Sequence, residues 1–282
     1  MGVQLANHLM ELMPEFRVAP TTKRIRARLG GQQVLDTTDA LLVWEPHRIV
    51  PVYAVPQDDL TATLSVAEPP PPEPGRIPPV LGPEKFALHT SPGQSFTVSA
   101  GGQVRPSAAF APTDPAAGGR ICLDFTAFDA WLEEDEPAIG HPHDPFHRID
   151  ILPSSRHVTV TLDGVQLADS RRPTALYETS LPVRWYLPPE DVRTDLMEPS
   201  QTHTVCAYKG TASYHSYDGA AGAEAGTDLA WTYPGPLPEA SRVAGLICFF
   251  SERVDITVDG ELQPRPQTPW SRSEPEADQP EP

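Results

Sequence analysis

One short stretch of the sequence brings together a thiol, an amine and two phenols, carried by Cys206, Tyr208, Lys209 and Tyr214. The thiolate is the nucleophilic form of cysteine, and a nearby ammonium group favours it. Phenol O–H groups can donate hydrogen bonds to a developing oxyanion. The stretch therefore predicts a catalytic site in which Cys206 is the nucleophile, Lys209 activates it and Tyr208 assists.

The backbone conformation decides whether these groups can meet. On one alternating strand, Cys206 and Tyr208 would point to one face and Lys209 to the other. The thiol and the ammonium would then be separated, unless the chain bends at Gly210. A buried cysteine beside a surface lysine, with no chemical role, is the structural alternative that the sequence leaves open.

Composition points to an all-β protein. Of the 282 residues 35 are proline, well above the usual share of about 5%. Each proline inside a helix removes a backbone hydrogen bond, so short strands joined by many turns are expected. Three cysteines without a Cys-x-x-Cys pair indicate reduced thiols and a cytoplasmic location.

The charge of the chain limits its partners. The formal net charge is −17, which disfavours binding to a phosphate backbone or to an anionic membrane surface. The N-terminus has no basic segment followed by an apolar one, so no signal peptide is expected. No stretch approaches eighteen consecutive apolar residues, so no membrane span is expected either.

An internal repeat organises the chain. Alternating apolar residues predict a strand at 24–29, and further strands are expected at 33–35, 40–44 and 50–54. The same series returns at 156–162, which also alternates, and at 165–169, 174–178 and 183–187. A gapless shift of 133 positions places Gly31 on Gly164 and aligns Glu45, Tyr53 and Asp58 with Glu178, Tyr186 and Asp191. The chain is therefore interpreted as a duplication.

The duplication predicts two tandem, similar, small domains, each a curved antiparallel sheet or barrel-like, with few short helices. The expected segments are 1–21 (N-terminal helix and lead-in), 22–136 (first domain, with a Pro-rich loop at 68–83), 137–262 (second domain) and 263–282 (disordered acidic Pro-rich tail). Leu5, Leu9 and Leu12 share one face of the N-terminal helix, which is expected to pack on the first domain.

Further candidates for ligand binding lie in the second copy: Tyr214, Trp231, Tyr233, Arg171, Arg184, Tyr186, Glu178 and Asp191. Arg171 and Arg184 have no arginine at the aligned positions of the first copy, and they could clamp a carboxylate or a phosphate. Glu178 and Asp191 do have acidic counterparts, so a structural role is the main alternative to acid–base chemistry.

The histidines at 141, 143 and 147 lie close together in the sequence, with Asp144 among them. Their spacing matches no zinc pattern, and the surrounding prolines are typical of an exposed linker. No metal site is therefore predicted. Nucleotidyl transfer would require metal-held phosphates, and neither an Asp-x-Asp pair nor a glycine-rich phosphate loop occurs in the sequence.

Several motifs resemble one known family. They are Leu167–Ser170, Leu176–Thr179, Trp185–Val192, Cys206–Tyr214 and Ala230–Pro234 in the second copy, with Val43–Pro46 and Val52–Asp58 in the first. The second copy resembles the domain-of-unknown-function 427 (DUF427) family, also catalogued as a nucleotidyltransferase-like domain. The two copies together resemble the tandem form seen in actinobacteria. The resemblance implies a small, strongly curved all-β domain, here twice, and it names no reaction and no cofactor.

Together these features predict a small-molecule enzyme or ligand-binding protein with a single site in the second domain. The alternative is a non-catalytic interaction module with a degenerate first copy, using the Pro-rich loop and the tail as contact surfaces. Unchanged partner recovery after deletion of residues 263–282 would contradict that alternative. The substrate, the cofactor and the oligomeric state stay open.

Overall fold

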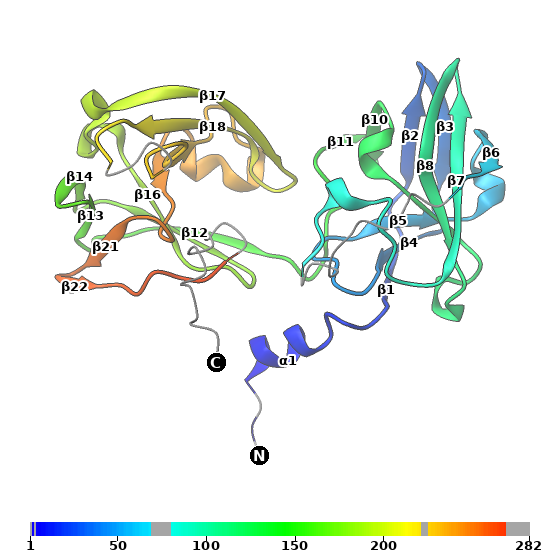
Figure 1. Cartoon of the computed structure of the whole chain (residues 1–282), viewed down its shortest axis with the longest axis horizontal. Coiled ribbons are helices and arrows are strands. Elements are labelled where there is room, and N and C mark those ends of the chain that lie inside the picture. Colours follow the sequence, from blue (N-terminus) through cyan, green and yellow to red (C-terminus); the bar gives the residue numbers. More distant parts are fainter. Residues whose placement is uncertain (1, 3, 69–79, 221–224, 269–282) are drawn as a thin grey trace, which may run out of the picture. The chain divides into compact units, whose positions relative to one another are not determined.

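The protein is described by a computed structural model that covers residues 2, 4–68, 80–220 and 225–268. Most of the predicted Pro-rich loop and of the acidic tail lies outside these residues. The chain divides into two compact units, Met1–Pro145 and Phe146–Pro282, which are coloured blue to green and green to red in Figure 1. Each unit is considered by itself.

The first unit contains two antiparallel sheets. The seven-stranded sheet has the order β1 (Arg17–Thr21), β4 (Ala40–Trp44), β5 (Val52–Val55), β9 (Ile121–Leu123), β8 (Gln103–Pro112), β7 (Gly93–Ala100) and β6 (Thr63–Val66). The four-stranded sheet has the order β11 (Glu136–Ala138), β10 (Ala130–Glu133), β2 (Ile25–Leu29) and β3 (Gln32–Thr37).

The second unit repeats this arrangement. Its seven-stranded sheet has the order β12 (Ile149–Pro153), β15 (Thr174–Glu178), β16 (Arg184–Leu187), β20 (Ile247–Phe249), β19 (Ala230–Thr232), β18 (Gly210–Tyr217) and β17 (Met197–Cys206). Its four-stranded sheet has the order β22 (Glu261–Leu262), β21 (Asp255–Val258), β13 (Val158–Leu162) and β14 (Val165–Ser170). The predicted all-β class is confirmed, and within the described residues the sheets are open and do not close into barrels.

Helical segments are few and short. The only α-helix of the described residues is α1 (Leu5–Glu11). The 3-10 turns are η1 (Gln57–Asp59), η2 (Pro83–Lys85), η3 (Pro115–Ala117), η4 (Phe125–Ala127), η5 (Pro189–Asp191), η6 (Thr194–Leu196) and η7 (Pro238–Val243). Leu5, Leu9 and Leu12 are exposed, so the predicted packing of their helix face is wrong. In the described part of the chain, no helix is both long and apolar enough to cross a membrane.

Alternation along the strands builds two hydrophobic layers in each unit. In β13, Val158, Val160 and Leu162 are buried and their neighbours are half-buried. They join residues of both sheets in one core cluster, so this layer lies between the sheets. The opposite face of the seven-stranded sheet carries a second cluster. We call this side the outer face.

Strand pairing corrects the gapless alignment of the two copies. Opposite the equivalent cysteines Cys122 and Cys248 lie Ala54 and Tyr186. The counterpart of Tyr186 is therefore Ala54 and not Tyr53. Residues 44–51 separate the paired Val43 and Val52, and residues 177–183, one fewer, separate their counterparts Leu176 and Arg184. An insertion of one residue reverses which face a strand residue occupies.

The same one-residue shift changes the alignment of the aspartates that follow this strand. Thr37 donates its hydroxyl hydrogen bond to Asp59 at 2.7 Å, and Ser170 donates to Asp191 at 2.7 Å. Asp191 therefore corresponds to Asp59 and not to Asp58. Because both units repeat this bond, it holds the turn after the fifth strand of each unit in place.

Candidate functional site

The stretch around Cys206 forms a tight turn and does not continue as one strand. β17 ends at Cys206 and β18 begins at Gly210. Gly210 has a φ of +97°, a conformation that glycine adopts without strain. The Leu237 amide donates a hydrogen bond to the Lys209 carbonyl at 3.1 Å. The bend that the sequence left open is present, and the single alternating strand considered there is wrong.

The Lys209 ammonium is directed at Glu178. Its Nζ lies 2.6 Å from both carboxylate oxygens, and the two side chains are 10% and 7% exposed. A buried ion pair of this kind leaves Lys209 with its charge already paired. The structure thus joins two predicted site residues that the sequence had assigned to different roles, and it gives Lys209 a partner other than the Cys206 thiol.

His147 completes this cluster. Its Nε2 lies 3.0 Å from Glu178 Oε1, and its ring stacks on Tyr208 at a centroid distance of 4.5 Å. Burial alone would raise the pKa of Glu178, but the hydrogen bond from His147 and the charge of Lys209 outweigh burial and lower it to about 2. Glu178 is therefore an anion held between an imidazole and an ammonium.

Sequence reasoning considered His147 only as a metal ligand. The described residues contain no group of three or more side chains placed to hold a metal ion. The position of His147 relative to a strand pair could have indicated this contact. β12 pairs with β15 and sets Ile149 opposite Glu178. His147 lies two residues before Ile149, and its side chain reaches Glu178 at the end of β15.

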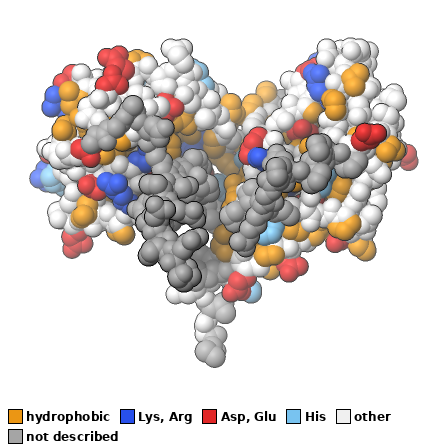
Figure 2. All heavy atoms as spheres, in the orientation of Figure 1, with side chains coloured by type: hydrophobic (Ala, Val, Ile, Leu, Met, Phe, Trp, Pro, Cys, Tyr) orange, Lys and Arg blue, Asp and Glu red, His pale blue; other side chains and the backbone are white. Residues whose placement is uncertain are grey.

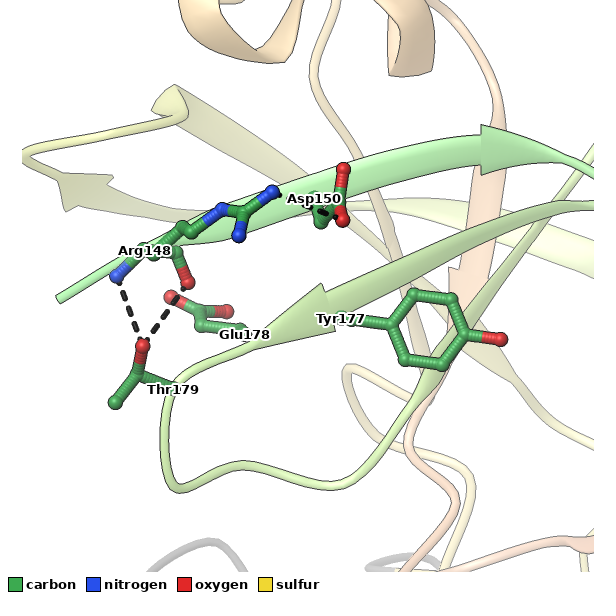
Figure 3. Close-up of a pocket in the computed structure, with 5 residues that line it drawn as sticks. All are labelled: Arg148, Asp150, Tyr177, Glu178 and Thr179. Carbon is green, nitrogen blue, oxygen red and sulfur yellow. Dashed lines mark hydrogen bonds and ion pairs between the residues drawn. The ribbon is translucent and has the colours of Figure 1, made fainter.

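A shallow pocket opens beside Glu178. It has a volume of about 260 Å³ and is lined by Arg148, Asp150, Tyr177, Glu178 and Thr179, as Figure 3 shows. The Arg148 amide donates to Thr179 Oγ1 at 2.9 Å, and its guanidinium lies 3.2 Å from Asp150. The rim thus offers a cation, a carboxylate and an exposed phenol ring to a polar ligand.

Four predicted aromatic residues belong to the outer face of the second unit. Tyr186, Trp231 and Tyr233 are buried there, with Tyr214 packed against them. The Trp231 indole N–H donates to the Tyr186 hydroxyl at 3.0 Å. Burial raises the pKa of Tyr233, and so do the negative charges of Cys206 and Tyr214 when they ionise.

Arg184 is not available as a ligand clamp. Its two terminal nitrogens donate to the two carboxylate oxygens of Glu252, each at 2.7 Å, and the side chains are 6% and 0% exposed. The predicted clamp role of Arg184 is therefore wrong. Glu252 was missed by the sequence analysis, since no motif marks it.

Arg171 and Asp191 belong to other surroundings. Arg171 is exposed, and its charge lowers the pKa of Asp169, after hydrogen bonds from His157 and Gln166. Asp191 accepts hydrogen bonds from Ser170 and Arg172. Neither residue lines the pocket beside Glu178.

The first unit provides a comparison for Glu178. Glu45 is 1% exposed and accepts hydrogen bonds from His89, Ser91 and Arg48 and from the Thr90 amide. Both glutamates thus hold an imidazole and a cation, although different parts of the chain supply them. Glu45 is enclosed by these donors, whereas Glu178 borders a pocket.

Comparison with known families finds a match within the second unit. Residues 150–260 match the model of a family described as a domain of unknown function (DUF427). The matched residues include Glu178, Lys209 and the turn at Gly210, and they begin just after His147 and Arg148. No curated protein matches the chain.

Proposed function

We propose that the DUF427 domain of this protein binds a small polar molecule in the pocket beside Glu178, and that the first unit is a diverged, supporting copy of the same domain. The main support for this proposal is the buried Glu178 anion, which Lys209 and His147 hold at the wall of an open pocket. A preformed charged group beside a cavity is a usual feature of ligand sites.

The tandem interpretation is supported by topology. Both units have the same strand order in both sheets, and both repeat the hydroxyl-to-aspartate bond after the fifth strand. The family match covers only the second unit, as expected if the first copy has diverged further.

The functional difference between the copies is supported by their outer faces. Pairing places Val52, Ala54 and Phe110 where the second unit has Arg184, Tyr186 and Trp231. The same fold therefore tolerates apolar residues at these positions. The polar and aromatic set of the second unit serves some purpose beyond folding.

The expected partner is a small molecule and not a nucleic acid or a membrane surface. Acidic side chains are spread over the face of each unit drawn in Figure 2, in keeping with the formal charge of −17. Such a surface repels polyanions.

Arg148→Ala is expected to weaken ligand binding about tenfold or more, because a hydrogen bond to a charged group contributes roughly 1.5–3 kcal/mol. The measurement is ligand-observed NMR with a defined panel of amino acids, monosaccharides and small organic acids, followed by titration of each compound that binds. Arg193→Ala is the matched control, since Arg193 is also an exposed arginine paired with an aspartate two residues later.

Binding by the native chain that Arg148→Ala weakens and Arg193→Ala leaves unchanged would support the site. If no compound of the panel binds, or if both variants lose affinity equally, the proposed pocket is not the ligand site.

The enzymatic version, in which Cys206 is a nucleophile, predicts a thiol more acidic than an ordinary one. Cys206 is half-exposed, while Cys122 and Cys248 are buried, and burial raises the pKa of Cys248 to about 12. Faster alkylation of Cys206 is therefore expected from access alone. The decisive measurement is the pH profile of its alkylation by iodoacetamide, followed by mass spectrometry.

If Cys206 is a nucleophile, the midpoint of its alkylation pH profile should lie well below about 8.5, the usual pKa of a free thiol. If Lys209 activates the thiol, this midpoint should rise in Lys209→Met. A midpoint at the ordinary value in both proteins would reduce the proposal to ligand binding alone.

A further inference from the structure

The Arg184–Glu252 pair is the most buried bidentate ion pair of the second unit's described residues. Arg184 also donates to Ser251 Oγ at 2.7 Å, and Thr268 donates to Glu252 at 2.6 Å. Burial opposes the charge on Arg184, but the hydrogen bonds to Glu252 outweigh burial and raise the pKa of the guanidinium. Both groups therefore stay charged beneath the outer face.

Stability does not explain this pair. Removing two charges from water costs about as much as their attraction returns, and apolar residues of similar volume are often as good or better. The first unit provides the internal control, because Val52 pairs with Val43 where Arg184 pairs with Leu176. The sheet position itself thus requires no charge.

The pair instead contacts the aromatic side chains of the outer face. The Arg184 guanidinium lies 5.5 Å from the centre of the Trp231 ring, within the range of a cation–π contact. Trp231 in turn donates to the Tyr186 hydroxyl, and their rings meet edge to face at 6.2 Å. Arg184 is held in one orientation by Glu252, so it fixes the plane of the indole.

We propose that the Arg184–Glu252 pair is a positioning device that holds Trp231 and Tyr186 in place on the outer face of the second unit and is dispensable for folding. Arg184 and Glu252 are positioning residues, since neither is exposed to a ligand.

The test compares the apolar double variant Arg184→Met/Glu252→Leu with the single variant Glu252→Leu in the full-length chain. The double variant should unfold within about 5 °C of the native protein, while the single variant, which removes the carboxylate that neutralises a buried guanidinium, should lose more than about 10 °C. In the double variant the indole N–H of Trp231 should exchange with solvent about tenfold faster than in the native protein, or more. NMR measures this exchange, with the signal assigned from Trp231→Phe.

Arg184→Lys is a second test variant, because it keeps the positive charge but loses the bidentate contact with Glu252. It should stay folded and show faster exchange of the Trp231 indole.

A double variant as unstable as Glu252→Leu would show that the pair is structural and would overturn the inference. Unchanged indole exchange in both variants would overturn it as well. If no compound binds the native chain, the proposed function fails, but the exchange comparison still decides whether Arg184 and Glu252 position Trp231.

Discussion

Arg48→Met is expected to lower the unfolding free energy of the first unit by about 3–5 kcal/mol, the usual cost of breaking a buried ion pair from one side. Arg48 is 2% exposed. It donates to Glu45 at 3.3 Å and to the carbonyls of Lys85, Phe86 and Leu88 at 3.2, 2.8 and 3.0 Å. Methionine fills much of the volume but leaves the Glu45 charge and three carbonyls without this donor.

Urea unfolding with hydrogen exchange resolved by unit measures the effect, because peptides from residues 1–145 report on the first unit alone. Arg24→Met is the control in the same unit. Its partner Asp36 and Arg24 itself are partly exposed, so a loss much smaller than that of Arg48→Met is expected. Equal losses in the two variants would mean that the Arg48 contacts contribute no more than a surface pair.

Acid is expected to destabilise the second unit by about 3 kcal/mol through Glu178 alone, since one pKa unit corresponds to about 1.4 kcal/mol. The folded-state pKa of this carboxyl is lowered from 4.5 to about 2. A lowered folded-state pKa means that the contribution is fully present above the unfolded value near 4.5. It is lost as the pH falls from there through about 2.

The measurement is the unfolding free energy of the second unit from pH 7 to pH 2, in the native protein and in Glu178→Gln. Other carboxylates titrate over the same range, and the difference in slope between the two proteins isolates Glu178. The variant should be less stable at pH 7 and should lose less stability on acidification. Parallel pH curves would contradict the lowered pKa of Glu178.

Glu45 and Glu178 indicate how the two similar units hold their outer faces. In each unit the carboxylate at the end of the fourth strand anchors the segment before the seventh strand, through Ser91 and His89 in the first unit and through Lys209 in the second. The anchoring role is common to both units. A ligand role is proposed only where the carboxylate also borders a pocket, as Glu178 does.

Much of the architecture could be predicted from the residues. The segments that became β2 and β13 were found because each buries one face, which leaves a period of two in the sequence. β5 and β16 are buried throughout and show no such period. β8 was missed, since Pro106 and Pro112 interrupt its pattern and proline is usually excluded from strand interiors. The one-residue shift between the two copies could not be seen in the sequence, because the gapless alignment still placed Tyr53 on Tyr186.

The sequence by itself determined the all-β class, the presence of two similar halves and the gathering of candidate side chains in the second half, because these depend on local pattern and composition. Only the tertiary structure decided which of those side chains meet. Lys209 pairs with Glu178 across 31 positions and Arg184 with Glu252 across 68. Strand pairing and the turn at Gly210 create these contacts, and residues so far apart carry no mutual signal in a single chain. For that reason Lys209 was first assigned to the neighbouring cysteine, and His147 and Glu252 were not recognised.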